Sequence, residues 1–237
     1  MNGPATVVFD FTREHLRAPL TLALLIAVPI FFVLIFAAVL GDFSAALGGD
    51  LATGAANAIS AGWAAAFLAG SLAFFQLSSA RSADRRLAAA GLGAWRVAAA
   101  RIAAALTLGL VVSCAAYLTL WLRSGIEHPW HAAVAIMAFA AIYIGVGAIV
   151  GAFVSDPLNG SLLVILVFSV DVFSGPAMSS GGGLTAFTPT RDAAELLISA
   201  GLGQGSPGSD WVAVAAVALG AIAVAIAAFW IPARPRL

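Results

Sequence analysis

Six long apolar segments alternate with shorter polar stretches along the chain. Their predicted bounds are residues 20–40, 55–77, 97–122, 132–154, 161–177 and 211–231. A helix rises about 1.5 Å per residue, so a segment such as 20–40 is long enough for a hydrocarbon core of roughly 30 Å. It is too long for the apolar core of a signal peptide, about 7–15 residues, and we expect it to be retained. The pattern predicts an all-α, polytopic membrane protein with six transmembrane helices in a single domain, 1–237.

The first 18 residues have the pattern of a helix lying in the membrane interface. The charged residues share one helical face, largely opposite the apolar residues: Asp10, Arg13, Glu14 and Arg17 against Val7, Val8 and Phe11. This spacing predicts an amphipathic interfacial helix over 1–18. Pro19 should end it, because the residue before a proline is biased away from helical geometry.

A second short helix is predicted in the long polar segment 178–210. Residues 189–200 follow Thr188 as N-cap and precede Gly201 as C-cap, and a flexible break lies at residues 181–183. Twelve helical residues reach about 18 Å, too short to cross a bilayer. We expect a short extracellular re-entrant helix that lies on or dips into the outer leaflet.

The polar stretch between the second and third apolar segments, residues 79–96, is rich in arginine. Around it lie five arginines and one acidic residue: Arg81, Arg85, Arg86, Arg96 and Arg101 against Asp84. Residues 82–90 favour a short helix on the membrane surface, with an Arg81–Asp84 pair and a break at Gly91–Gly93. Arg101 is expected to snorkel toward the cytosol. An ordinary positively charged loop explains the charge equally well.

Composition and charge narrow the class of protein further. The chain is 62% hydrophobic and 9% charged, with a mean hydropathy of +1.04, which is typical of an integral membrane protein. The net charge is zero, so nothing indicates nucleic-acid binding. All basic residues are arginine, and a P-loop needs lysine, so the chain itself is not a P-loop ATPase. With the single Cys114 no intrachain disulfide can form.

The distribution of arginine predicts the orientation. With both termini in the cytoplasm, nine of the eleven arginines face the cytosol, while Arg123 and Arg191 lie outside. Such an excess is the positive-inside bias of membrane proteins. We therefore expect a multi-pass protein of a bacterial inner membrane with both ends cytoplasmic.

Catalytic and metal-binding patterns are weak. Neither HExxH nor GxSxG occurs in the sequence, so no catalytic residue is predicted and no enzyme activity is expected. His128 and His131, with Glu127 beside them, could ligate a metal ion. A proline-containing surface turn accounts for them as well, and no metal or cofactor is predicted for this chain.

Asp171 is the only acidic residue inside a predicted span. At a helix centre it costs roughly 2.5–3.5 kcal/mol on insertion scales, so it should face the bundle interior or a wet cavity. It is either a polar point on a transport path or an aspartate near the interface, bonded to Ser169, Ser174 or the glycine-rich turn.

The layout as a whole resembles one family. The parts are FTREHLRAPL before the first span, DRRLAAAGLGAWRVAAAR between the second and third, and FTPTRDAAELL before the sixth. They are similar, in order and spacing, to the transmembrane permease subunits of type-2 ABC exporters. That resemblance implies a separate ATPase subunit, which holds ATP and Mg²⁺. It also implies contacts to that subunit from two groups of residues: Arg81, Asp84, Arg85, Arg86 and Leu87 of the coupling loop, and Arg13, Glu14 and Arg17 of the first helix. Family members often have a proline after the coupling helix, where this chain has Gly91 and Gly93.

The resemblance also implies alternating access between two permease halves, either two copies or this chain with a homologous permease. Spans two and five would line the path, and its wall would include Phe67, Phe74, Phe75, Phe168 and Phe173, with Asp171 as a polar point. Such a wall favours a hydrophobic or amphipathic substrate, either drug-like or lipid-like. Two other classes stay open: a proton-coupled secondary transporter that uses Asp171, and a membrane scaffold that transports nothing.

Overall fold

The computed structural model describes residues 19–46, 51–178, 188–204 and 208–233. All regular structure in this part of the chain is helical, and six helical segments are long and apolar enough to cross a membrane. They are Ala23–Ala46, Thr53–Leu92, Ala94–Ser124, Pro129–Phe153, Pro157–Ser174 and Asp210–Ala228. The prediction of an all-α chain with six such helices is confirmed. The amphipathic helix at 1–18, with Arg13, Glu14 and Arg17, lies outside the described residues.

Two helices form the centre of the bundle. Helix α4 (Thr53–Leu87) and helix α6 (Pro129–Phe153) pack against each other, and α5 (Ala94–Ser124), α7 (Pro157–Ser174) and α9 (Gly208–Ala233) surround them. In the apolar windows of α4 and α6, 72% and 67% of the residues are buried, against 17% in α9. The many alanine and glycine residues of α4 and α6 allow this close packing, because small side chains let helix backbones approach closely.

The contact between α4 and α6 depends on glycine at one crossing. A Cβ atom on Gly147 would lie 2.0 Å from the carbonyl oxygen of Gly70, and one on Gly151 would lie 3.0 Å from the Cβ of Leu77. Two non-bonded atoms cannot lie 2.0 Å apart without a clash, so no residue with a side chain fits at position 147 without a shift of the helices. The GxxxG spacing of Gly147 and Gly151 therefore serves helix packing, as its sequence context indicates.

The first long helix is irregular and longer than predicted. It consists of α2 (Pro19–Phe31), a π-helical turn η1 (Phe32–Phe36) and α3 (Ala37–Ala46). Pro29 lies inside α2, where it removes one backbone hydrogen bond, and the π-turn follows three residues later. Residues 41–46, predicted as the start of a loop, are helical, because Leu40 and Ser44 are buried on the same side of α3.

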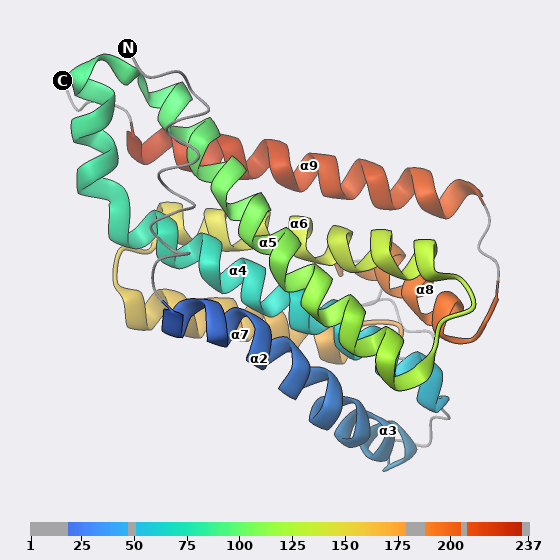
Figure 1. Ribbon diagram of the computed structural model, residues 1–237. Helices are drawn as coiled ribbons and strands as arrows, with labels where there is room; N and C mark the ends of the chain where they lie inside the picture. Colours follow the sequence, from blue (N-terminus) through green and yellow to red (C-terminus); the bar gives the residue numbers. More distant parts are fainter. Residues whose placement is uncertain (1–18, 47–50, 179–187, 205–207, 234–237) are drawn as a thin grey trace.

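The predicted surface helix at 82–90 is not a separate element. Helix α4 continues without a break to Leu87, followed by a second π-turn η2 (Ala88–Leu92) and then α5. The predicted break is confirmed: Gly91 and Gly93 have φ angles of 103° and 77°, a region that favours glycine. Figure 1 shows the teal ribbon of α4 turning aside before it meets α5. Ser78 and Ser79 donate to the carbonyl of Phe75, a pattern that bends helices.

The short helix of the segment 178–210 begins two residues later than predicted. Helix α8 spans Arg191–Gly201, with Thr190 as N-cap and Leu202 as C-cap. Pro189 lies in the turn before it, and Gly203, with a φ of 67°, supplies the left-handed residue after it. Thr188 and Gly201 were the wrong caps, because Thr190 is held by a buried side chain described below.

Candidate functional site

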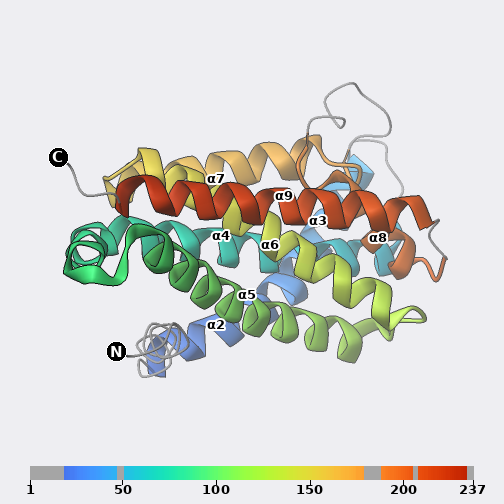
Figure 2. The same ribbon diagram turned by 90° about the horizontal axis from the view of Figure 1, so that it is seen from above.

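A helical hairpin joins α4 and α5 at one end of the bundle. We define it as residues 78–101. The start of α2 and the end of α9 lie at the same end (Figures 1 and 2). A buried ion pair connects its two arms: Arg101 Nη2 lies 2.9 Å from Asp84 Oδ1, and Arg101 Nε donates to both carboxylate oxygens at 3.1 and 3.3 Å. Asp84 therefore pairs with Arg101 rather than Arg81, and Arg101 is buried instead of snorkelling.

Arg81 fastens the hairpin to a third helix. Its Nη2 donates to the carbonyl oxygens of Gly151 and, at 3.0 Å, Val154. These groups lie at the C-terminal end of α6, where carbonyls have no partner within the helix and the helix dipole favours a positive charge. The hairpin is thus closed by the Asp84–Arg101 pair and fastened to α6 by Arg81.

Fewer of the predicted contact residues are exposed on the hairpin than the sequence suggests. Of the five coupling-loop candidates, Arg81 and Asp84 make internal contacts, while Arg86 is exposed and Arg85 and Leu87 are half-buried. Two residues that the sequence analysis did not single out as contacts are exposed beside them, Trp95 and Arg96. The sequence feature that could have indicated their exposure is the position of Trp95 and Arg96 just after the break at Gly93. We call Arg85, Arg86, Leu87, Trp95 and Arg96 the hairpin tip.

Aromatic rings gather where η1, α4, α6 and α7 meet. Phe67 and Phe168 have ring centroids 5.1 Å apart, and Phe32 lies 6.3 and 6.2 Å from them. The group continues to Phe36, Trp63 and Tyr143, each within 6.0 Å of a neighbouring ring. We call these six residues the aromatic cluster: Phe32, Phe36, Trp63, Phe67, Tyr143 and Phe168. Two predicted path residues, Phe67 and Phe168, belong to it.

Phe75, a third predicted path residue, is 46% exposed on α4, and two more phenylalanines of the predicted path also lie outside the aromatic cluster. Phe74 is fully buried in a separate small cluster with Val150 and Val164, so it is a packing residue. Phe173 is 57% exposed, and its ring lies 5.7 Å from that of Phe43 on α3. The structure therefore does not bring these two residues to the aromatic cluster.

Asp171 adjoins the aromatic cluster through Tyr143. Its carboxylate is 2% exposed, and Oδ2 accepts hydrogen bonds from Tyr143 Oη and Thr190 Oγ1, both at 2.8 Å. The other oxygen, Oδ1, has no hydrogen-bond partner within the described residues. The predicted bonds to Ser169 or Ser174 are not the ones found; Ser169 donates to the carbonyl of Ile165 instead. The glycine-rich turn at 181–183 lies outside the described residues.

A cavity of about 380 Å³ opens beside Asp171. It lies between α7 and the turn that precedes α8, and apolar side chains form most of its wall. Its lining residues are Leu166, Val167, Val170, Asp171, Ser174, Thr188 and Pro189. The buried carboxylate is the one acidic group in this wall.

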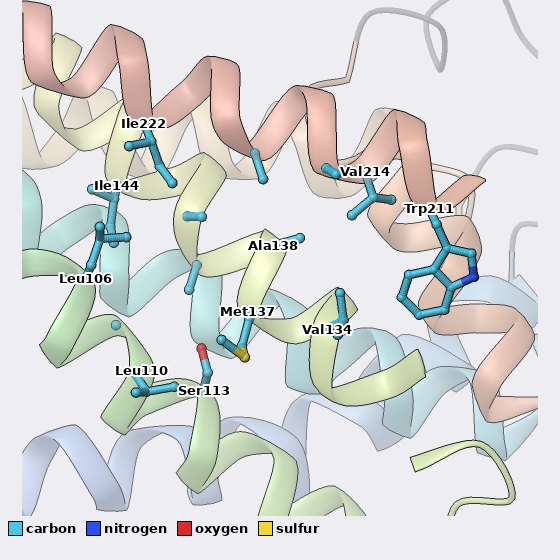
Figure 3. Close-up of a pocket in the computed structure, with 15 residues that line it drawn as sticks. Leu106, Leu110, Ser113, Val134, Met137, Ala138, Ile144, Trp211, Val214 and Ile222 are labelled. Atoms are coloured by element: carbon cyan, nitrogen blue, oxygen red, sulfur yellow. The ribbon is translucent and has the colours of Figure 1, made fainter. Parts of the chain in front are cut away.

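A second cavity, of about 330 Å³, lies between α5, α6 and α9 (Figure 3). Trp211 stands at one end, Ile144 and Ile222 at the other, and the wall is almost entirely apolar. The hydroxyl of Ser113 lines it and has no hydrogen-bond partner in the described part of the chain. A hydrocarbon chain fits such a surface, but no charged group is present to orient a polar ligand.

The histidines at the opposite end of the bundle do not form a metal site with the described residues. The rings of His128 and His131 lie 5.1 Å apart, and His131 also contacts Trp211 at 4.8 Å. No three histidine, cysteine, aspartate or glutamate side chains come together in residues 19–46, 51–178, 188–204 and 208–233. The ring contacts account for the positions of both histidines.

In comparisons with known proteins, the sequence matches no family model and no curated protein.

Proposed function

We propose that this chain is the transmembrane permease subunit of an ABC exporter. It would form half of the translocation path for a hydrophobic or amphipathic substrate, and a separate ATPase subunit would supply the energy. One observation carries the proposal: a buried ion pair joins the two arms of the hairpin and Arg81 fastens it to α6, yet the hairpin presents an exposed basic and aromatic tip.

The hairpin tip has the composition of a protein-binding surface. Tryptophan and arginine dominate the residues that contribute most to interfaces, and Trp95 lies 58% exposed between Arg86 and Arg96 in the sequence. An ATPase docked on the tip would move a hairpin whose arms are joined by Asp84 and Arg101 and which Arg81 connects to α6. ATP and Mg²⁺ would bind to that partner, because this chain has no lysine for a P-loop.

The aromatic cluster supports the assignment of a path. It combines residues of the first, second, fourth and fifth long helices, and Phe67 and Phe32 are only half-buried within this chain. A second copy or a homologous permease would complete the path. The charges support a bacterial inner membrane location with the hairpin and both termini in the cytoplasm. The hairpin end carries Arg85, Arg86 and Arg96, while Arg123 and Arg191 belong to the opposite end.

The test is recovery of the tagged chain from its native membrane in mild detergent, with mass spectrometry of the retained proteins. We expect a stoichiometric P-loop ATPase, which Arg86→Glu and Trp95→Ala should each release. Trp121→Ala is the matched control, because Trp121 is similarly exposed at the other end of α5. Recovery of a second permease would separate a heterodimer from a homodimer.

If no nucleotide-binding protein is ever retained, the exporter proposal fails. A proton-coupled transporter is then the next candidate. The observation that favours it is a carboxylate in the apolar part of α7 whose described partners are two neutral hydroxyls. A membrane scaffold would require neither this carboxylate nor the hairpin tip.

A further inference from the structure

The cavity beside Asp171 has the chemistry of a ligand site. We propose that it binds the cationic group of a hydrophobic monocation, with Asp171 Oδ1 as the counter-ion. The binding itself does not depend on the proposed function. That the bound monocation is the exported cargo does rest on the exporter proposal.

The hydrogen bonds of Asp171 leave one oxygen available. Tyr143 of α6 and Thr190, the N-cap of α8, both donate to Oδ2 and orient the carboxylate, while Oδ1 has no hydrogen-bond partner among the described residues. A buried charged group without a counter-charge is costly, and a ligand that supplies the missing charge gains most of that energy on binding. Two neutral hydroxyls stabilise the carboxylate but do not neutralise it.

No arginine of the chain is positioned to fill this role among the described contacts. Arg191 is the nearest in sequence to Thr190, and it pairs with Glu195 at 2.9 Å on the surface of α8. Arg101 pairs with Asp84, and Arg123 donates to the carbonyls of Val33 and Leu34 in η1. Within the part of the chain that the structure describes, these three arginines therefore contact groups other than Asp171.

The wall of the cavity selects the class of cation. Leu166, Val167, Val170 and Pro189 offer an apolar surface, which suits an organic cation better than a hydrated metal ion. One carboxylate matches one positive charge, and a divalent metal would need more oxygen ligands than the wall supplies. The same carboxylate disfavours anionic ligands.

The experiment measures saturable binding of tetraphenylphosphonium to the purified full chain in detergent, without any ATPase. Tetraphenylborate is the control ligand, because it has the same shape and size but a negative charge. We expect tetraphenylphosphonium to bind and tetraphenylborate not to bind. Asp171→Asn should weaken tetraphenylphosphonium binding at least tenfold, because the amide keeps an acceptor for Tyr143 and Thr190 but removes the charge.

A second variant keeps the inference testable if Asp171→Asn does not fold. Val170→Trp adds bulk to the cavity wall at a position that is exposed in this chain, and it should lower affinity while the carboxylate is intact. Val212→Trp, on the exposed face of α9, is the matched control and should bind as the unmodified chain does.

Unchanged binding in both Asp171→Asn and Val170→Trp would overturn the inference, as would equal binding of the cation and the anion. Neither result would affect retention of an ATPase, and loss of the ATPase would not affect this binding. The two proposals can therefore fail separately.

Discussion

Asp84 and Asp171 are two buried carboxylates in one bundle, with 4% and 2% of their surface exposed, but they are satisfied in different ways. Asp84 meets a guanidinium that donates to both of its oxygens. Asp171 meets two hydroxyls that donate to one oxygen, and the other oxygen has no hydrogen-bond partner in the described part of the chain. Burial alone therefore does not distinguish a structural carboxylate from one that is available to a ligand, whereas the partners of each oxygen do.

The two sites also differ in where they act. The Asp84–Arg101 pair connects the two arms of the hairpin, so its charges cancel within the fold. Asp171 connects α7 to α6 and to the residue that precedes α8, next to a cavity. The Asp84–Arg101 pair suits a hairpin that moves as a rigid unit, and the surroundings of Asp171 suit a binding site.

The comparison is tested most strongly by making the same substitution at both positions. Asp84→Asn should lower the free energy of unfolding by about 3–5 kcal/mol, because it removes the negative charge that is paired with the buried Arg101 guanidinium. Asp171→Asn should lower it by less than about 1 kcal/mol, because both hydroxyls keep an acceptor. Denaturant titration in mixed micelles, followed by tryptophan fluorescence, measures both. Equal losses would show that the two carboxylates are structurally equivalent.

A smaller effect is expected for the other anchor of the hairpin. Arg81→Met removes two charge-assisted hydrogen bonds to the end of α6 and should cost about 1.5–3 kcal/mol in the same titration. Hydrogen exchange should increase locally, in the hairpin and at residues 150–154. Arg86→Met, on the exposed tip, is the control and should change neither quantity. Unaltered exchange in Arg81→Met would mean that Arg81 does not hold the hairpin to α6.

The hydroxyl partners of Asp171 should each contribute modestly. Tyr143→Phe removes one of two donors and should cost about 0.5–1.5 kcal/mol of unfolding free energy. Tyr117→Phe is the natural control, because Tyr117 is half-buried at a distance from the carboxylate and is the chain's only other tyrosine. A loss as large as that expected for Asp84→Asn would indicate that Tyr143 does more than orient Asp171.

The smallest effect is expected when the whole ion pair is replaced. Asp84→Leu combined with Arg101→Met should bring stability back to within about 1 kcal/mol of the unmodified chain, since apolar residues often replace a buried pair without loss. Measured against each single variant, this double-mutant cycle gives the coupling energy of the pair. Additive losses would show that the two side chains do not depend on each other.

Much of the fold could be predicted from local sequence patterns. Apolar length predicted all six long helices, and glycine chemistry predicted the break at Gly91 and Gly93. Helix ends were less accurate: α3 and α4 extend past their predicted ends, because packing of Leu40 and the ion pair of Asp84 hold turns that local propensity does not decide. The N-cap of α8 is Thr190 rather than Thr188, and the hydroxyl of Thr190 binds Asp171, a residue 19 positions away.

The sequence by itself determined that this is a helical, membrane-spanning type of chain, because segment length and hydropathy are local properties. It also identified Asp171 as unusual and residues 79–96 as a basic segment. Only the tertiary structure decided which charges pair. Arg81 lies three residues from Asp84 in the sequence, but Asp84 binds Arg101 on the other arm of the hairpin. The tertiary structure likewise placed Phe67 with Phe168, separated Phe74 and Phe173 from them, and exposed Trp95. Those outcomes depend on the angles at which helices cross, which no local pattern specifies.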